Sequence, residues 1–442
     1  MARIASVGLW HLGCVASAAL ASLGHTVCGT DPDAEVVHNL QQGVLPIYEP
    51  GLAALMAEQT RQGKLDFRCS PWEAFEKAEF IFLTFDTPVD ENDQSNLTPL
   101  ESALQEIARH VSRAVQIVVM SQIPVGTCQR FAERLRELAP QLPFSLVYQP
   151  ENLRLGEALE TFLRPDFLLV GAQDKAAAGR LLRLYDGILA PKLVVSWSSA
   201  EMAKHALNAF LATSISFANE LADLADLSGA DVRDVVRTLR LDRRIGEQAF
   251  LSPGPGFSGG TLGRDVQTLR GLAERAGRKA RQLDATLAVN ASRIPDLVAR
   301  LRQVCGPLGG LRLGLLGLTY KPGTSTLRRS HALTMARLLA QEGAEVRGFD
   351  PQVAEPRPET MGILICPNPY QAAENADGVL LATPWPEFQT LDFARLGRVM
   401  RRPVLLDAHN CLDDRKVKEA GFRYCGMGIP AGGNLGFGGP DE

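Results

Sequence analysis

Residues 3–31 read RIASVGLWHLGCVASAALASLGHTVCGTD, and this segment combines two strand patterns with a glycine turn and an apolar helical stretch between them. The first strand pattern covers Arg3–Val7, the turn covers Gly8–Gly13, and the second strand pattern ends at Asp31. A strand, a glycine turn, a helix and a strand with a terminal acid, in that order, are typical of a unit that binds a dinucleotide. The N-terminal part of the chain is therefore predicted to be a doubly wound α/β domain.

Five residues of this segment are candidate cofactor-binding residues: Gly8, Trp10, Leu12, Gly13 and Asp31. Asp31 lies about twenty residues beyond the turn, the usual distance for an acid that accepts hydrogen bonds from the adenosine ribose, which favours NAD over NADP. Trp10 occupies the middle glycine position, where the backbone normally approaches the pyrophosphate. Two interpretations follow: Trp10 packs outward and the turn binds NAD differently or more weakly, or cofactor binding is altered or lost.

Composition limits the class of protein. The chain has 442 residues, which is more than one hydrophobic core usually supports, so two or three domains are expected. Hydrophobic residues make up 45% and the net charge is −4, which fits a soluble globular protein and excludes a strongly basic nucleic-acid binder. The apolar run Val15–Leu23 is too short to span a bilayer, so no membrane partner is expected.

The eight cysteines are scattered without a Cys-x-x-Cys pair, and the seven histidines are dispersed. This spacing fits reduced thiols in the cytoplasm better than a disulfide framework. It also indicates no metal site.

A second α/β pattern follows in the C-terminal part of the chain. A strand and turn begin at Leu311, a helical pattern covers Ser330–Gly343, and strand patterns continue to Pro403–Asp407. Between the two α/β parts, from Ser198 to about residue 300, the pattern is mostly helical. The predicted fold class is α/β, with two doubly wound Rossmann-like domains joined by a central helical domain, and the expected limits are 1–196, 197–300 and 301–442.

One loop interrupts the helical part and is the expected place for chemistry. Leu251–Asp265 reads LSPGPGFSGGTLGRD, whose glycines and prolines exclude regular helix or strand and let the backbone come close to a ligand. Asp265 begins a long helical pattern, and a helix start offers free backbone N–H groups to a bound anion.

This loop resembles the active-site loop of the nucleotide-sugar 6-dehydrogenases, the UDP-glucose and GDP-mannose dehydrogenase family, which reads G-x-G-[FY]-G-G-S-C-x-P-K-D. On that pattern Thr261 stands where the family keeps its nucleophilic cysteine, Arg264 stands at a lysine, and Asp265 stands at the aspartate. A mere linker is the alternative, but matching motifs from Gly8 to Gly428 disfavour it. The chain is identified as a divergent member of the family that lacks the catalytic cysteine.

The resemblance also assigns catalytic residues outside the loop. Lys204 and Asn208 match the family's catalytic lysine and asparagine, and because they are four residues apart in a helical pattern they share one face. Alone, such residues usually mark a solvated face, but here they lie among Ala, Leu and Phe. The segment QPENLRLG, residues 149–156, keeps the family's Glu151, although Leu155 replaces a second glutamate. The candidate catalytic residues are Glu151, Lys204, Asn208, Thr261 and Asp265.

Other matching motifs imply contacts to the cofactor and the substrate. Thr87 and Pro88 match a G-T-P segment and are expected on the nicotinamide side. Gln122, a further candidate cofactor-binding residue, replaces a threonine of S-T-V-P-x-G-T that helps to position water in the family's active site. Two charges of the family's nucleotide motifs have changed, in TLRRS at 326–330 and in DAHN at 407–410. The candidate substrate-binding residues are Leu153, Arg154, Arg244, Phe257, Gly259, Lys321 and Arg328.

The family's chemistry depends on the cysteine. In the family, the C6 alcohol loses a hydride to NAD, the aldehyde is trapped by the thiolate, a second hydride gives a thioester, and water releases a uronic acid. A thiol ionises near pH 8 to 9, whereas a threonine hydroxyl is far less acidic, so a covalent route through Thr261 is not expected.

Three hypotheses follow. The first is an NAD-dependent oxidoreductase that acts at C6 of a nucleotide sugar, UDP-linked rather than GDP-linked, with a net two-electron reaction that stops at the aldehyde or a slow four-electron one. The second is an epimerase that keeps its NAD bound, and the third is a non-catalytic nucleotide-sugar binder. The resemblance also implies a homodimer formed through the central helix.

Overall fold

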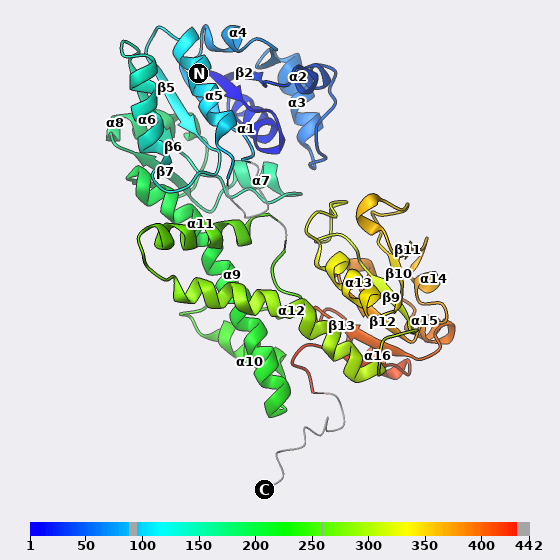
Figure 1. Cartoon of the computed structure of the whole chain (residues 1–442). Coiled ribbons are helices and arrows are strands. Elements are labelled where there is room, and N and C mark those ends of the chain that lie inside the picture. The colour runs from blue at the N-terminus through cyan, green and yellow to red at the C-terminus, as the bar shows by residue number, and fades with distance from the viewer. Residues whose placement is uncertain (88–94, 259, 431–442) are drawn as a thin grey trace. The chain divides into compact units, whose positions relative to one another are not determined.

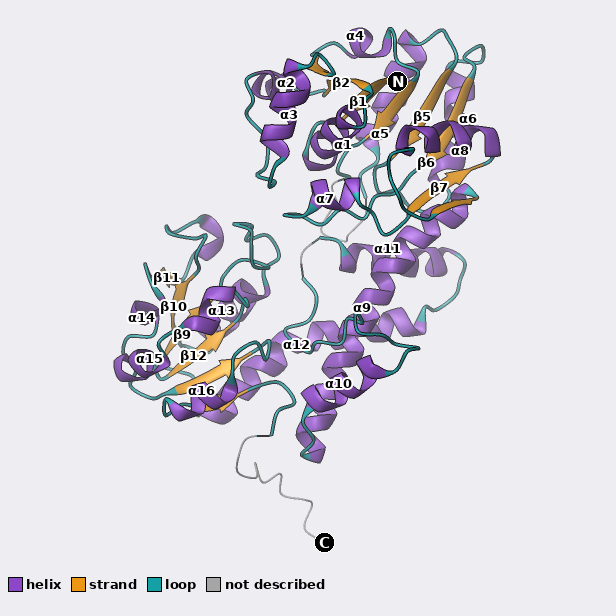
Figure 2. Ribbon diagram, turned by 180° about the vertical axis from the view of Figure 1, so that it is seen from behind, coloured by secondary structure: helices purple, strands orange, loops and turns teal. Residues whose placement is uncertain are grey.

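The computed structural model describes residues 1–87, 95–258 and 260–430 (Figure 1). The chain divides inside the long helix α9 (Trp197–Ser228) into two units, Met1–Ala206 and Leu207–Glu442. Each unit contains its own sheet with helices on both faces (Figure 2).

The sheet of the first unit has eight strands within the described residues, and neighbours are parallel except for the sixth and seventh. The ladder of the first two strands pairs Arg3 with Thr26 and Val7 with Thr30, so the glycine turn and the end of the second strand meet at one edge. In spatial order the strands are β3 (Leu65–Phe67), β2 (Thr26–Thr30), β1 (Arg3–Val7), β4 (Phe80–Leu83), β5 (Val115–Val119), β6 (Phe144–Tyr148), β7 (Leu168–Ala172) and β8 (Lys192–Val195).

Helices cover both faces of this sheet, as a largely parallel sheet requires. On one face lie α1 (His11–Ser22), α2 (Ala34–Gln41), α3 (Leu52–Arg61), α7 (Ala158–Leu163) and α8 (Lys175–Leu182), which is followed by the 3-10 helix η1 (Arg183–Tyr185). On the other face lie α4 (Pro71–Phe75), α5 (Thr98–His110) and α6 (Thr127–Leu138).

The sheet of the second unit is parallel throughout its described strands, and its order repeats that of the first six strands of the first unit. This order places a crevice at the carboxyl ends of the central strands in both sheets. The strands are β11 (Ile363–Ile365), β10 (Glu345–Phe349), β9 (Arg312–Leu316), β12 (Gly378–Leu381), β13 (Val404–Asp407) and β14 (Arg423–Cys425).

The helices of the second unit also form two layers. One face of the sheet packs against the C-terminal part of α9 together with α10 (Val232–Leu241), α12 (Arg281–Cys305) and α13 (His331–Gln341). The other packs against α14 (Pro369–Ala372), α15 (Phe393–Val399) and α16 (Asp414–Glu419). The remaining elements are α11 (Leu262–Arg275) and the 3-10 helices η2 (Pro358–Thr360) and η3 (Pro386–Thr390).

Aspartates fix where several helices begin. Asp33, Asp174, Asp231 and Asp413 each precede a helix and accept backbone N–H groups of its first turn. Such caps satisfy N–H groups that have no partner inside the helix. The helix starts are therefore encoded locally.

The predicted fold class is confirmed: two doubly wound α/β parts flank a helical part that contains α9 to α12. The β1 strand has the bounds expected from the sequence. Helix α11 begins at Leu262 rather than at Asp265, because Thr261 takes the position before the first turn. We retain the limits 1–196, 197–300 and 301–442 as a proposal.

Candidate active site

The glycine turn after β1 has a backbone that requires glycine at both ends. Gly8 adopts a φ of +96°, which L side chains rarely adopt. A Cβ on Gly13 would lie 1.8 Å from the Gly8 carbonyl oxygen. Helix α1 begins at His11, and its first turn receives no side-chain cap from Trp10. Its first N–H groups therefore point to the edge of the sheet, where they can hold an anionic group.

Asp31 closes this turn from the end of β2. Its Oδ2 accepts the Leu9 N–H at 2.6 Å and its Oδ1 accepts the Asp33 N–H at 2.9 Å. Each carboxylate oxygen can accept a further hydrogen bond, and Asp31 is only partly buried. The carboxylate is therefore available to the hydroxyls of a ribose.

Trp10 leaves the backbone of the turn unstrained. Its φ is −84°, which any residue can adopt, and its side chain is 48% exposed. The indole lines a hollow of about 210 Å³ together with residues of α2 and of the loop that follows α2. The tryptophan at the middle glycine position therefore changes the surface of the crevice but not the backbone conformation of the turn. Leu12, by contrast, is buried in α1.

Helix α9 holds the loop that carries Gln122. The Glu201 carboxylate accepts the N–H groups of Gly126 (2.6 Å) and Cys128 (2.8 Å), and His205 Nε2 lies 2.8 Å from the Ile123 carbonyl oxygen. The Thr87 hydroxyl donates to the Gln122 carbonyl oxygen at 2.8 Å, so these two predicted residues lie together. Pro88 lies outside the described residues.

Lys204 contacts the segment of Glu151, but not through the Glu151 carboxylate. Its Nζ donates to the Glu151 carbonyl oxygen and, at 3.1 Å, to Asn152 Oδ1. The Glu151 carboxylate instead accepts the backbone N–H of Leu153. Lys204 is only 7% exposed, so its charge faces oxygen atoms of the protein with little water around it.

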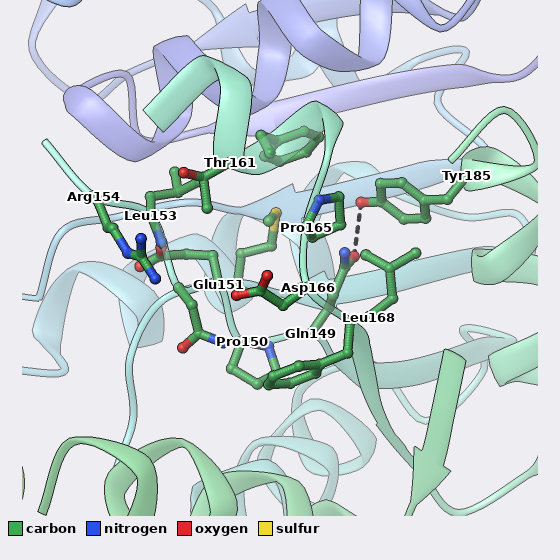
Figure 3. Close-up of a pocket in the computed structure, with 14 residues that line it drawn as sticks. Gln149, Pro150, Glu151, Leu153, Arg154, Thr161, Pro165, Asp166, Leu168 and Tyr185 are labelled. Carbon is green, nitrogen blue, oxygen red and sulfur yellow. Dashed lines mark hydrogen bonds between the residues drawn. The ribbon is translucent and has the colours of Figure 1, made fainter. Parts of the chain in front are cut away.

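Glu151, Leu153 and Arg154 line a small hollow of about 70 Å³ in the first unit (Figure 3). The Tyr185 hydroxyl donates to Gln149 Oε1 at 2.8 Å across one end of it. Arg154 lies at the opposite end in this view. The hollow thus gathers one predicted catalytic and two predicted substrate-binding residues next to Lys204.

Asn208 and Asp265 form a buried pair in the second unit. Asn208 Nδ2 donates to Asp265 Oδ2 at 2.5 Å, and the two residues are 7% and 0% exposed. Arg264 Nε lies 3.9 Å from Asp265 Oδ1. A buried carboxylate with an amide and a cation beside it is held in one orientation, as a group that positions a reactant must be.

Asparagines fix the glycine-rich loop of the second unit. Asn219 Oδ1 accepts the Gly254 N–H at 2.7 Å. Asn290 accepts the Phe257 N–H at 2.7 Å and donates to the Phe257 carbonyl oxygen at 3.1 Å. Thr261 follows in an exposed position before α11. Gly259 lies outside the described residues.

Three further predicted substrate-binding residues belong to other segments of the second unit. Lys321 and Arg328 belong to the connection between β9 and α13, where Arg328 is exposed. The Arg244 side chain is 89% exposed and pairs with Asp242 at 2.7 Å. Within the second unit, Arg244 is therefore a surface residue.

His409, which stands at the arginine of the family's D-x-R-N motif, lines a hollow beside the glycine loop. The hollow measures about 440 Å³ and is also lined by Arg240 and Gly254, and His409 Nε2 lies 3.0 Å from the Ala382 carbonyl oxygen. Burial lowers the pKa of His409, and burial together with His409 lowers the pKa of His331 to about 4. Both imidazoles are therefore neutral at pH 7.

Sequence reasoning assigned no role to several residues that hold these loops. Glu49 is 2% exposed and accepts the N–H groups of Gly156 (2.9 Å) and Ala158 (2.8 Å). Its only sequence signal was the motif PIYEPGL, residues 46–52. Asn219 and Asn290 gave no signal beyond a polar residue in a helix, because their partners lie more than thirty positions away.

Family models match most of the chain. The NAD binding domain of the UDP-glucose/GDP-mannose dehydrogenase family matches residues 2–189, its central domain matches residues 198–292, and its UDP binding domain matches residues 314–414. A UDP-glucose 6-dehydrogenase of Rhizobium meliloti (strain 1021) is 34% identical over 97% of this chain and 100% of that protein. The chain belongs to the UDP-glucose/GDP-mannose dehydrogenase family.

Solved structures of this family agree with the fold. A UDP-glucose dehydrogenase from Pyrobaculum islandicum superposes with a TM-score of 0.88 at 34% identity, covering 97% of this chain and 98% of that one. A UDP-D-ManNAc dehydrogenase from Pyrococcus horikoshii superposes with a TM-score of 0.85 at 25% identity, covering 97% and 100%. The protein is an NAD-dependent nucleotide-sugar dehydrogenase.

The described residues of the first unit fit the family's cofactor. The free start of α1 suits a pyrophosphate, and the partly exposed Asp31 carboxylate suits a ribose. Trp10 departs from the family pattern without straining the turn. Among the helices that the structure describes, none has the length and apolar character needed to cross a bilayer.

Proposed function

We propose that the protein oxidises the C6 hydroxyl of a UDP-linked hexose, UDP-glucose or a close relative, to the aldehyde with NAD. In this proposal Lys204, Asn208, Asp265 and Glu151 act at the sugar, whereas Thr261 does not form a covalent intermediate. The reaction then stops after one hydride transfer.

The buried Asn208–Asp265 pair is the observation that carries the proposal. Asn208 lies on the same helix as Lys204, and because the two are four residues apart they share one face of α9. Asp265 reaches Asn208 from α11. Burial of a carboxylate has a free-energy cost but does not by itself indicate catalysis, because Asp350 is buried as well. Asp265 is bonded to a side chain that shares a helix face with Lys204, and this link supports catalysis over passive binding.

NAD, when bound, accepts the hydride that leaves C6. Lys204 can donate a hydrogen bond to the C6 oxygen as negative charge develops on it, in exchange for one of its present acceptors. The Asn208 amide, held by Asp265, can orient the same oxygen or a water molecule that takes the proton. These roles need no nucleophile.

Thr261 supports an aldehyde product. Its position before α11 corresponds to the family's cysteine, but its hydroxyl is a poor nucleophile without a base and forms no thioester. Full oxidation would need hydration of the aldehyde and a second hydride transfer without covalent help. We therefore expect the reaction to stop at the aldehyde.

The match of residues 314–414 to the family's UDP binding domain supports a UDP-linked donor. We propose that Lys321 and Arg328 contact the nucleotide and that Leu153, Arg154, Phe257, Gly259 and Arg244 contact the rest of the donor. Thr87, Pro88 and Gln122 are proposed to contact the cofactor, Thr87 and Pro88 on its nicotinamide side.

The test is NADH formation over a panel of UDP-, GDP-, ADP-, CDP- and dTDP-sugars, with mass analysis of each product. The proposal expects NADH and a sugar lighter by two hydrogens with a UDP-hexose. An altered sugar without NADH would instead indicate epimerisation on bound cofactor. No change with any donor would contradict the proposal.

A thiol restored by Thr261→Cys is the matched variant. We expect it to raise the yield of uronic acid from the same donor, because the aldehyde can then be trapped covalently. Ser258→Cys, which adds a thiol to the same loop away from the nucleophile position, is the control. Equal acid from both variants would show that the missing cysteine does not limit the reaction.

We also propose a homodimer in the cytoplasm. On α9, Phe210, Phe217 and Leu224 are 72%, 48% and 57% exposed, and their spacing of seven residues gives one apolar stripe of the kind that pairs helices.

The proposed compartment rests on the cysteines. The eight cysteines, all among the described residues, are free, which fits a reducing compartment.

A further inference from the structure

The hollow beside Trp10 is lined by three separate parts of the first unit. Trp10 comes from the glycine turn, Asp33, Glu35, Val36 and Asn39 come from the start and first turns of α2, and Val44, Leu45 and Pro46 come from the loop after α2. It measures about 210 Å³. We name it the Trp10 hollow.

The position of the Trp10 hollow relates it to one half of a dinucleotide. Asp31, whose carboxylate faces the turn, is two residues before Asp33 in the wall of the hollow. In a doubly wound sheet the adenosine ribose lies at the acid that ends the second strand. The base attached to that ribose therefore extends towards α2, where the hollow lies.

The chemistry of the walls suits a flat heteroaromatic ring. The indole of Trp10 is one large apolar face, and Val36, Val44, Leu45 and Pro46 add aliphatic surface. Trp10 is 48% exposed and Val44 is 53% exposed, so both have surface left to bury against a ligand. Glu35 and Asn39 carry oxygen atoms that can accept hydrogen bonds from an exocyclic amine.

We propose that the Trp10 hollow is the adenine subsite of the cofactor site, and that the adenine ring stacks on the Trp10 indole. The inference rests on the NAD-dependent function and deepens it. It gives the tryptophan a binding role: the contact that a glycine backbone makes with the pyrophosphate is replaced in part by a contact between two rings. Stacking of a base on an aromatic side chain tolerates such a change because it depends on ring area rather than on backbone approach.

The experiment uses tryptophan fluorescence, because the chain has four tryptophans and two of them are buried. Trp197 and Trp385 are 6% and 8% exposed. Trp72 is 46% exposed, and its ring centroid lies 5.9 Å from that of His110 at the end of α5. In a Trp72→Phe background, quenching by a ligand in the crevice of the first unit therefore reports mainly on Trp10.

ADP is the probe, because it carries the adenosine and the pyrophosphate but no nicotinamide and cannot be reduced. We expect ADP to quench the Trp72→Phe protein to saturation. By calorimetry, Trp10→Ala should weaken both ADP and NAD by about 5- to 100-fold, and Trp10→Phe, which keeps a ring, should weaken them less. Trp72→Phe alone should leave both affinities unchanged. Thermal unfolding of each variant checks that the fold persists.

Binding of ADP and NAD with unchanged affinity in Trp10→Ala, or with tighter affinity, would overturn the inference and leave the NAD-dependent function intact. Tighter binding would identify Trp10 as an obstruction. Absence of both ADP and NAD binding from the native protein would overturn the inference and the proposed function together.

Discussion

In each of the two sheets, an aspartate after one strand accepts backbone N–H groups from the turn after the neighbouring strand. The two aspartates differ in how far they are exposed. In the first unit, Asp31 after β2 accepts the Leu9 N–H from the turn after β1 at 2.6 Å. In the second unit, Asp350 after β10 accepts the N–H groups of Leu318 (2.7 Å) and Thr319 (2.9 Å) from the turn after β9. The strand order around both turns is the same.

The difference lies in what else reaches the carboxylate. Asp350 also accepts the Thr319 hydroxyl at 3.0 Å and the Trp385 indole N–H at 3.1 Å, and it is 2% exposed. Asp31 accepts no side-chain hydrogen bond from the part of the chain that the structure describes, and it remains partly exposed. The connection from β9 to α13 is also long, residues 317–330, whereas β1 and α1 are joined by residues 8–10. The same arrangement therefore leaves its carboxylate accessible in the first unit and encloses it in the second.

The largest effect is expected from substitution of Lys204, because this residue is proposed to donate a hydrogen bond to the reacting oxygen. Its substitution therefore tests whether the polar groups of the first unit take part in catalysis. Lys204→Ala is expected to lower kcat by about 100- to 1,000-fold, the usual cost of removing one donor to a developing oxyanion. The affinity for NAD should change little. Steady-state kinetics and calorimetry measure the two quantities.

Lys175→Ala, an exposed lysine of α8, is the control and should leave kcat unchanged. A Lys204→Ala protein that keeps its full kcat would remove the lysine from the mechanism.

Exchanging the two aspartates tests the comparison itself. Asp350→Ala leaves several buried donors without an acceptor and is expected to lower the free energy of unfolding by about 3 kcal/mol or more. Asp31→Ala loses fewer bonds at a partly exposed site and is expected to cost about 1 kcal/mol in stability, while it weakens NAD binding. Urea unfolding and calorimetry distinguish the two effects.

If Asp31→Ala destabilised the protein as much as Asp350→Ala and bound NAD normally, the two carboxylates would have the same structural role. The contrast between an accessible Asp31 carboxylate and an enclosed Asp350 carboxylate would then be wrong.

A smaller effect on stability is expected from a change of pH. In both units, the helix that follows the first turn begins with a histidine. His11 lies 2.9 Å from the Glu49 carboxylate, whereas burial and His409 lower the pKa of His331 to about 4. As the pH falls from about 6.5 towards 4, the unfolded chain takes up a proton at His331 that the folded protein does not, so stability falls. We expect the free energy of unfolding to fall by about 1–2 kcal/mol over this pH range. The His331→Asn variant, measured by urea unfolding at each pH, should not show this fall.

A stability that stays constant between pH 6.5 and 4.5, or one that falls equally in His331→Asn, would show that His331 is not the group responsible.

Local patterns account for what the sequence predicted well. The strand bounds Arg3–Val7 and the acid at the end of the next strand follow from alternation and spacing within thirty residues. Gly8 and Gly13 could be recognised because their roles depend on the turn itself.

Contacts between distant segments could not be predicted in the same way. Asp350 and Asp31 have the same local pattern, but Asp350 also accepts hydrogen bonds from the side chains of Trp385 and Thr319. Two other contacts also depend on side-chain placement, which sequence periodicity does not encode. The Glu151 carboxylate accepts the Leu153 N–H, and the Glu201 carboxylate accepts the Gly126 N–H.

The ratio of NADH formed to UDP-glucose consumed tests the central claim most directly. Because Thr261 stands at the position of the family's cysteine, the account predicts one NADH per sugar and a nucleotide-linked aldehyde as the product. Two NADH per sugar with a uronic acid would contradict it, because the protein would then complete both oxidations without a thioester.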